Sequence, residues 1–245
     1  MNEQGVDARS LAVACGVDPK TVERWLSHGR RPHGRQRRLA AAALEVKETE
    51  LWPDPAIPTQ RIPRGSEELV RVYPNRASVP RETWLELLQG AERRIEILVF
   101  SGTFFAQTNP KIARMLAAQA AAGAEVRLCF GDPASAAVAI RDEEEGLHGT
   151  LSAKIRASLT YYTELLAVER CRIRLHGATL YASLFRYDDQ VLVNPHIWGQ
   201  PASANPLLHL RRAEEGGWFD VYTESFDAVW TAARPLTAEE GIPRG

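Results

Sequence analysis

The stretch TLYASLFRYDDQVLVNPHIW, residues 179–198, determines how we interpret the longer part of this chain. Two apolar segments, TLYASLFR and QVLVN, flank the acidic pair Asp188–Asp189. Short apolar runs separated by a tight polar turn are typical of a β-hairpin. We therefore predict two antiparallel strands that are joined at these aspartates.

The chain before this hairpin alternates between strand-like and helix-like segments. IEILVF (95–100) and EVRLCF (125–130) are expected to be buried strands, and the segment between them (109–123) has helical spacing and ends at Gly123. This order predicts a parallel pair of strands with a right-handed crossover. Further helices are expected at 81–94, 152–168 and 218–233, and a strand at RIRLH (172–176).

A Pro-rich segment divides the chain into two regions. PDPAIPTQRIPRGS, residues 53–66, contains four prolines, which fix φ and remove backbone donors. We expect a small all-α domain at 1–53, a linker at 54–66 and a larger α/β domain at 67–245.

The N-terminal region contains the pattern of a helix-turn-helix. In ARSLAVACGVDPKTVERWLS (8–27), Ala12 is small enough for two helices to cross closely, and Gly16 suits the turn. Asp18 is expected to cap the second helix, with Pro19 at its first position. Between residues 20 and 38 there are seven Lys or Arg and one acidic residue.

This pattern resembles the helix-turn-helix of the phage-repressor (Xre-like) regulators. The resemblance implies that the second helix contacts base edges and that the arginines after it contact phosphates. The expected DNA-binding residues are Lys20, Thr21, Glu23, Arg24, Arg30, Arg31 and Arg35. The alternative is a solvated helical hairpin that packs on the other domain.

The larger region resembles the phospholipase D-like fold on the segments IEILVF, AEVRLCFGD, RIRLH and the quoted hairpin. That superfamily carries H-x-K-x-x-x-x-D, in which the histidine attacks phosphorus, the lysine binds phosphate and the aspartate orients the histidine. Alignment on the acidic turn puts Tyr181, Ser183 and Asp188 at these positions. None of the six histidines begins a complete motif elsewhere. From this we expect a catalytically degenerate domain, and therefore no enzyme.

The polar residues near the hairpin remain candidates for a binding site. Ligand-binding or dimer-site candidates are Tyr181, Ser183, Asp188, Arg174, His176 and His196. An anion pocket at strand ends would also draw on Lys154, Arg156, His209 and Arg211. Such a pocket would hold a neutral or weakly anionic effector, or the cluster would be purely structural at a dimer interface.

Composition narrows the function further. The net charge of −1 excludes bulk attraction for nucleic acid, so any DNA binding must be local. Three distant cysteines fit a reducing cytoplasm and predict neither a metal site nor disulfides, and we expect no cofactor. We expect no signal peptide, and the apolar runs are too short to span a bilayer.

The order of short sequence segments across both regions resembles that of a group of actinobacterial regulators. These regulators join an Xre-like module to such a domain. The resemblance implies a cytoplasmic, homodimeric transcriptional regulator that binds an operator in double-stranded DNA. Two alternatives remain open: a diverged phosphodiesterase or nuclease that uses another nucleophile, such as His176 or His196, and a protein-interaction scaffold.

Overall fold

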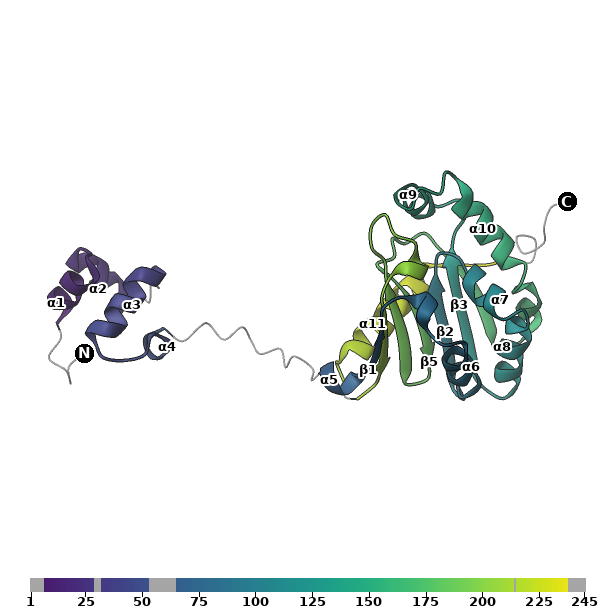
Figure 1. Ribbon diagram of the computed structural model, residues 1–245, viewed down its shortest axis with the longest axis horizontal. Coiled ribbons are helices and arrows are strands. Elements are labelled where there is room, and N and C mark those ends of the chain that lie inside the picture. The colour runs from purple at the N-terminus through teal and green to yellow at the C-terminus, as the bar shows by residue number, and fades with distance from the viewer. Residues whose placement is uncertain (1–6, 29–31, 53–64, 214, 238–245) are drawn as a thin grey trace. The chain divides into compact units, whose positions relative to one another are not determined.

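The computed structural model describes residues 7–28, 32–52, 65–213 and 215–237 (Figure 1). The chain divides into two compact units, Met1–Ile62 and Pro63–Gly245. The smaller unit is helical, and the larger unit is built around an eight-stranded sheet. The expectation of a small all-α domain followed by a larger α/β domain is confirmed.

The N-terminal unit contains four helices in its described residues. They are α1 (Ala8–Cys15), α2 (Pro19–His28), α3 (Gly34–Ala43) and α4 (Glu48–Leu51). They pack around one apolar core formed by Leu11, Ala12, Cys15, Val22, Ala40 and Leu44. The helical spacing of the first three of these residues, with Val22 one turn into the second helix, is what allows α1 and α2 to share that core.

The larger unit has the strand order β1-β7-β6-β5-β2-β3-β4-β8. The strands β2, β3 and β4 are parallel to one another, and the remaining neighbours are antiparallel. Their bounds are β1 Leu69–Tyr73, β2 Arg94–Val99, β3 Glu125–Gly131, β4 Cys171–His176, β5 Ala182–Tyr187, β6 Gln190–Pro195, β7 Leu207–Arg211 and β8 Arg234–Pro235.

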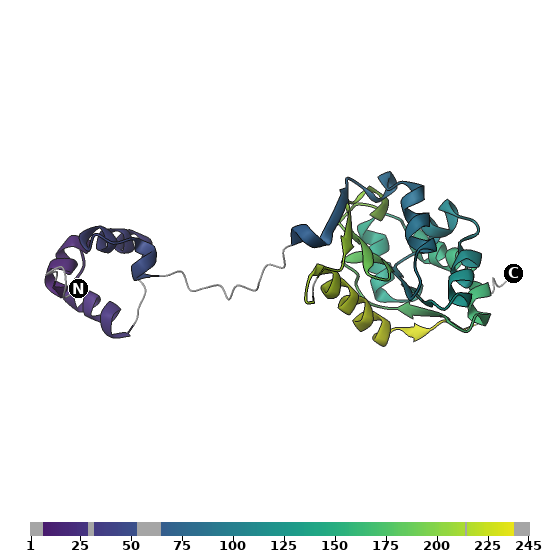
Figure 2. The ribbon, with the colours of Figure 1, turned by 90° about the horizontal axis from the view of Figure 1, so that it is seen from below.

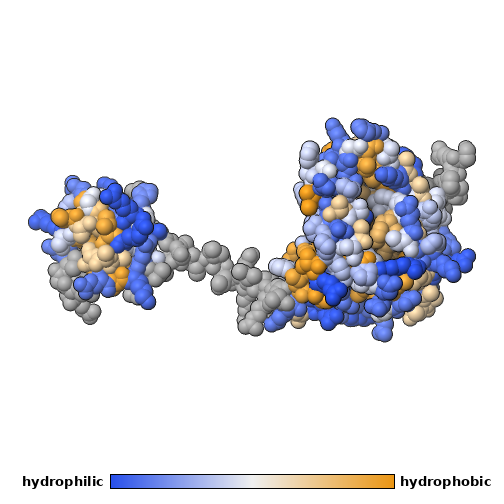
Figure 3. Space-filling model, in the orientation of Figure 1, coloured by the Kyte–Doolittle hydropathy of each residue, from blue (hydrophilic) through white to orange (hydrophobic). Residues whose placement is uncertain are grey.

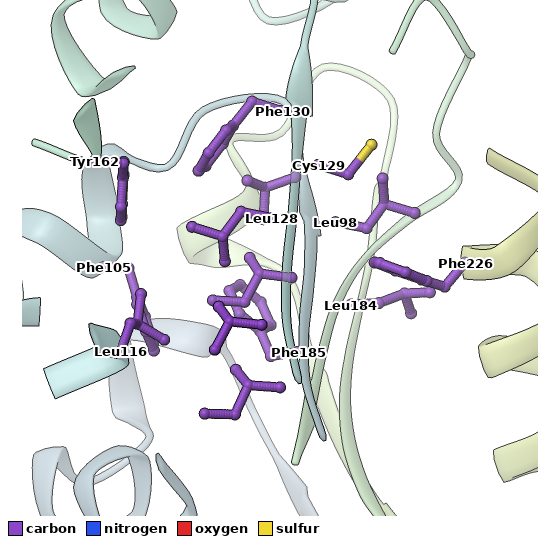
Figure 4. Packing of buried hydrophobic residues seen from close by; sticks show 14 of the residues in the cluster. Leu98, Phe105, Leu116, Leu128, Cys129, Phe130, Tyr162, Leu184, Phe185 and Phe226 are labelled. Atoms are coloured by element: carbon purple, nitrogen blue, oxygen red, sulfur yellow. The ribbon is translucent and has the colours of Figure 1, made fainter. Parts of the chain in front are cut away.

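Helices cover both faces of this sheet, as the two ribbon views show (Figures 1 and 2). In the close-up, Phe105 and Leu116 approach one face of the sheet and Phe226 approaches the other (Figure 4). The helices are α5 Gly65–Glu68, α6 Arg81–Gln89, α7 Thr103–Thr108, α8 Ile112–Ala121, α9 Ala136–Glu144, α10 Thr150–Leu159 and α11 Trp218–Ala232. Three short 3₁₀ turns are η1 Arg76–Ser78, η2 Thr163–Ala167 and η3 Ala202–Ala204.

Most of the expected elements of the larger unit are present. The parallel β2–β3 pair and the β5–β6 hairpin are confirmed. Asp188 in the turn has φ of 50°, a left-handed conformation that aspartate tolerates better than most residues. The helix expected at 152–168 is instead α10 followed by η2, and the strands β1 and β7 were not predicted.

A buried ion cluster lies on the α11 face of the sheet. Glu96 of β2 has no exposed surface, and it pairs with Arg127 on β3 and with Arg186 on β5. The Arg186 Nη1 to Glu96 Oε2 distance is 3.0 Å. Arg127 also binds Asp227 of α11 at 3.0 Å, so the same cluster attaches that helix to the sheet.

A second buried carboxylate holds the N-terminus of α11. Glu68 accepts hydrogen bonds from the backbone N–H of Trp218 at 2.5 Å and of Phe219 at 3.3 Å. The first N–H groups of a helix have no partner within the helix, and a carboxylate also interacts favourably with the helix dipole there. Gly217 is required because a Cβ at this position would lie 2.1 Å from a Glu68 carboxylate oxygen.

We expect Glu96→Ala to lower the free energy of unfolding by about 3–5 kcal/mol, because it leaves Arg186 without its buried carboxylate and Arg127 with Asp227 alone. Urea unfolding followed by circular dichroism measures the change. The matched control is Glu125→Gln, which removes a half-exposed carboxylate 3.7 Å from Arg94. The control should cost at most about 1 kcal/mol. Equal losses in the two variants would contradict the role of the Glu96 cluster.

Candidate active site and nucleic-acid interface

A polar cavity of about 450 Å³ opens at the end of the sheet where β2 finishes and β5 begins. The walls come from the residues after β2, from α7 and α10, and from the segment after β6. Open α/β sheets commonly bind ligands beyond the carboxyl ends of their parallel strands. We call this cavity the His196 pocket. Its polar lining residues are Arg76, Ser101, Thr103, Gln107, Glu145, Lys154, Ser183, His196 and Ser203.

Two of these residues form a hydrogen-bonded pair inside the pocket. Ser183 Oγ lies 2.9 Å from His196 Nε2. Ser183 is the second residue of β5 and its side chain is buried, whereas His196 follows the last residue of β6. Because β5 and β6 pair in antiparallel register, with Ser183 opposite Asn194, the hairpin brings these two side chains together.

The second ring nitrogen determines the tautomer of His196. Its Nδ1 lies 3.1 Å from the backbone carbonyl oxygen of Leu180, an acceptor only. Nδ1 must therefore carry the hydrogen and donate it, which leaves Nε2 of the neutral ring with its lone pair. Ser183 Oγ–H then donates to Nε2. A hydroxyl that donates to an oriented imidazole is the arrangement of an activated nucleophile and its base.

The surroundings keep this imidazole neutral. Burial, together with the positive charges of Arg141 and Arg76, lowers the pKa of His196 to about 4. Arg141 is itself held by Glu144, by Glu145 and by the backbone carbonyl of Gln200. An anion bound in the pocket would oppose these effects and raise the pKa of His196.

Arg76 and Lys154 supply positive charge at the pocket. Burial lowers the pKa of the Arg76 guanidinium to about 10, and nearby Glu145 opposes the shift. That value keeps Arg76 charged at neutral pH. Its Nη1 is 3.4 Å from Asn194 Oδ1, and the guanidinium lies over the Phe104 ring at 4.5 Å from the centroid. Lys154 is exposed on α10. Two cations beside a hydroxyl–imidazole pair suit a phosphate group.

The remaining sequence-predicted candidates lie outside the pocket. Tyr181 is 84% exposed, and Asp188 lies at the far end of β5, where its carboxylate accepts from the backbone N–H groups of residues 92, 93 and 94. These bonds lower the pKa of Asp188 against the effect of burial. The structure therefore does not bring Tyr181, Ser183 and Asp188 to one place. Whether any of them binds a ligand stays a prediction.

Two basic candidates on β4 also lie elsewhere. Arg174 donates to the backbone carbonyl of Trp230 at 2.7 Å and lies over its ring, on the α11 side. His176 is 1% exposed and its Nε2 is 3.2 Å from the Val99 carbonyl, so it is part of the packing behind the pocket. Of the two histidines named as alternative nucleophiles, only His196 reaches the pocket.

Sequence reasoning missed Arg76, which lies in the loop after β1 in the segment YPNRAS. No local pattern marks it, and its position depends on a backbone hydrogen bond of 3.0 Å from its N–H to the distant carbonyl of Asn205. Gly102, between the lining residues Ser101 and Thr103, packs closely against the core, because a Cβ there would lie 2.4 Å from Phe130.

In the N-terminal unit, α1 and α2 are joined by a tight turn at Gly16. Gly16 adopts φ of 63° between α1 and α2, and Ala12 is 1% exposed where the helices meet. Asp18 Oδ1 accepts from the backbone N–H of Lys20 at 2.9 Å, as a capping residue does. The structure leaves Lys20, Glu23, Arg24 and Arg35 exposed and Thr21 half-buried, whereas Arg30 and Arg31 lie outside the described residues.

The described residues contain no group of three or more side chains arranged to hold a metal ion. They also contain no helix that is both long and apolar enough to cross a membrane. The surface in Figure 3 is mostly hydrophilic, with a hydrophobic patch on the larger unit. Among the apolar residues of β1, Val70 and Val72 are exposed.

The larger unit is thus an α/β domain with a hydroxyl–imidazole pair in a cationic pocket. Residues 66–197 match the family described as Domain of unknown function (DUF5919), and the chain belongs to that family. Among curated proteins, no relative matches this chain.

Three solved structures are similar to it at low sequence identity. A phospholipase D family member, Nuc from Salmonella typhimurium, is 15% identical with a TM-score of 0.43, over 68% of this chain and 96% of that chain. TrmBL2, an archaeal chromatin protein described with a novel mode of DNA binding, is 13% identical with a TM-score of 0.43, over 90% and 72%. NucT from Helicobacter pylori is 12% identical with a TM-score of 0.40, over 63% and 89%.

One expectation from the sequence requires correction. The interpretation of the chain as no enzyme is contradicted, because the solved structures similar to it include one described as a phospholipase D family member. The absence of the motif's histidine and lysine from this strand did not justify that interpretation. The sequence of one strand does not show which residues from other parts of the chain lie next to it.

We expect acid to destabilise the larger unit through its buried histidines. Burial lowers the pKa of His196 and of His209 to about 4, below the ordinary value of about 6.5. As the pH falls below 6.5 the unfolded chain binds protons that the folded chain does not bind, so the free energy of unfolding decreases until about pH 4. Urea unfolding at pH 7.5, 6 and 5 measures this slope.

The double variant His196→Gln/His209→Gln should lose much of the slope between pH 6.5 and 5, where ordinary carboxylates remain ionised. The slope that remains is expected from His176, whose pKa burial also lowers. A slope equal to that of the wild-type protein would assign the pH dependence to other groups.

Proposed function

We propose that this protein is a DNA-binding phosphodiesterase whose His196 pocket cleaves a phosphodiester. The observation that carries the proposal is the Ser183 Oγ–His196 Nε2 hydrogen bond, with its tautomer set by the Leu180 carbonyl, inside a cavity that Arg76 and Lys154 line. A nucleophile, an oriented base and phosphate-binding cations are the groups that this reaction requires.

The proposed reaction has two steps. Ser183 Oγ attacks phosphorus and gives its proton to His196 Nε2, so that an Oγ–P bond forms while the bond from phosphorus to the leaving oxygen breaks. The His196 imidazolium returns that proton to the leaving oxygen. Water, deprotonated by His196, then attacks phosphorus, the Oγ–P bond breaks, and the imidazolium returns its proton to Ser183 Oγ. Arg76 and Lys154 bind the non-bridging oxygens and stabilise the charge that develops on them.

The low pKa of His196 suits the first step once substrate is bound. The free enzyme keeps the ring neutral, so Nε2 is available to accept at neutral pH. A bound phosphate anion partly cancels the field of Arg76 and Arg141, which makes the imidazole a stronger base when it is required. A direct attack by His196 Nε2 is the variant of this mechanism in which Ser183 only orients the ring.

We expect His196→Gln to reduce kcat by about 10²–10⁴-fold, because it removes the proton acceptor. Release of p-nitrophenolate from bis(p-nitrophenyl) phosphate and cleavage of a labelled oligonucleotide, both in the presence of a chelator, measure it. The kcat of Ser183→Ala should fall by a similar factor. With bis(p-nitrophenyl) phosphate, mass spectrometry of the acid-quenched wild-type enzyme should find a p-nitrophenyl phosphate group attached to Ser183. His209→Gln, at the other end of the sheet, is the control and should retain activity.

Two results would change this assignment. An adduct on His196 with activity retained in Ser183→Ala would make the imidazole the nucleophile. A wild-type protein without turnover of either substrate would remove the phosphodiesterase proposal.

The N-terminal unit supports a second candidate, an operator-binding transcriptional regulator. The left-handed Gly16 between α1 and α2, with the exposed polar side chains of α2, is the geometry of a recognition helix. In this candidate the protein is an Xre-like homodimer matched to a palindromic operator, and the His196 pocket binds an effector. Thermal stabilisation by a phosphate-bearing ligand without turnover would favour it over the phosphodiesterase.

Both candidates require the N-terminal unit to bind duplex DNA. We expect Arg24→Ala to weaken DNA binding by about 1–3 kcal/mol and to relax the base preference. Arg35→Ala should weaken binding to all DNA sequences alike and reduce the slope of log affinity against log salt concentration by about one unit. Fluorescence anisotropy at several salt concentrations measures both effects. Arg9→Ala, on the exposed side of α1, is the control. Equal affinity of all three variants and the wild type would exclude this DNA-binding surface.

A further inference from the structure

A second cavity, of about 320 Å³, lies beside the His196 pocket. The side chains of α6 and α7 and the start of α8 form most of its walls, and these walls are mainly apolar and aromatic. We call it the Trp84 cavity. Its apolar lining includes Trp84, Leu85, Leu88, Phe104, Phe105 and Ile112. The volume falls within the range of small-molecule sites.

Two hydrogen-bond donors at this cavity are unused. Trp84 is 7% exposed, and its indole Nε1 is buried without a hydrogen-bond partner among the described residues. The Nε of Arg76, which also lines the cavity, is buried without a partner in the same part of the chain. Buried donors are nearly always paired, and an exception calls for an explanation. A bound ligand that brings acceptor atoms would provide one.

Arg76 and Phe104 line both cavities. The guanidinium lies 4.5 Å from the centroid of the Phe104 ring, and its Nη1 is held by Asn194. A single ligand could therefore contact Arg76 from the His196 pocket with an anionic group and extend a second group into the Trp84 cavity.

We propose that the Trp84 cavity binds the nucleobase of a nucleotide whose phosphate lies in the His196 pocket, an inference that rests on the proposed function of that pocket. Aromatic walls formed by Trp84, Phe104 and Phe105 favour a planar ring through edge and face contacts. Ring nitrogens and carbonyl oxygens of a base are acceptors for the indole N–H. An alkyl chain, as in a phospholipid, has no acceptor and would leave this donor unpaired, as it is in the free protein.

The test compares ligands that differ in one part. Isothermal titration calorimetry of the full chain measures adenosine 5′-monophosphate, ribose 5-phosphate, which has the same phosphate and sugar without the base, and adenosine, which has no phosphate. We expect the nucleotide to bind the wild-type protein at least about tenfold more tightly than ribose 5-phosphate.

Two variants address the cavity itself. Leu85→Trp fills it from its half-exposed wall, so the affinity for the nucleotide should fall to that for ribose 5-phosphate, which should not change. Trp84→Phe keeps an aromatic ring but removes the N–H. It should lower the affinity for the nucleotide by up to about tenfold without changing the affinity for ribose 5-phosphate. Thermal unfolding in the absence of ligand shows that both variants fold, and Leu85→Ala is a second cavity variant if the larger side chain disrupts packing.

The outcomes separate this inference from the proposed function. Equal affinities for the nucleotide and ribose 5-phosphate in the wild-type protein would overturn the base site and leave the phosphate site. Binding of adenosine that Leu85→Trp abolishes, without binding of ribose 5-phosphate, would support the base site and remove the phosphate site. A nucleotide affinity that is unchanged in both Leu85→Trp and Trp84→Phe would overturn the base site.

Discussion

Glu96 imposes the main constraint on the larger unit. A carboxylate with no exposed surface in a central strand must be paired, since an unpaired buried charge is strongly destabilising. Its partners are the residues directly across from it on both neighbouring strands, Arg127 on β3 and Arg186 on β5. A slip of one residue in either pair would move the partner arginine to the other face of the sheet and leave Glu96 buried with an incomplete set of cations. The ion cluster thus sets the register of three strands.

That register has a direct consequence for the site. Ser183 lies three residues before Arg186 and therefore on the opposite face of the sheet. Once Arg186 is fixed opposite Glu96, Ser183 lies at the end of β5 that is next to the end of β2. The hairpin then places His196 beside Ser183. Removal of the ion cluster would therefore loosen the hydroxyl–imidazole pair, although no atom of Glu96 touches the pocket.

The electrostatics of the His196 pocket depend on opposed effects. Burial and two arginines keep the imidazole neutral, while the carbonyl of Leu180 fixes which nitrogen is free. Arg76 both lowers the pKa of His196 and offers a cation to an anionic ligand. The same guanidinium borders the aromatic Trp84 cavity, so one residue connects the charged and the apolar parts of the proposed substrate site.

The sequence by itself determined the local elements. Gly16, Asp18 and Pro19 specify the turn and the start of α2 through φ and capping, and the alternation around Asp188–Asp189 specifies the β5–β6 hairpin, because these effects act over a few residues. Buried runs also predicted the parallel β2–β3 pair. Only the tertiary structure decided which side chains meet. Ser183 and His196 were both candidates, but Asp188 shares a strand end with neither, and Arg76 enters the pocket through a loop held by Asn205. Such contacts join residues that are distant in sequence, and packing of the whole sheet rather than local spacing determines them.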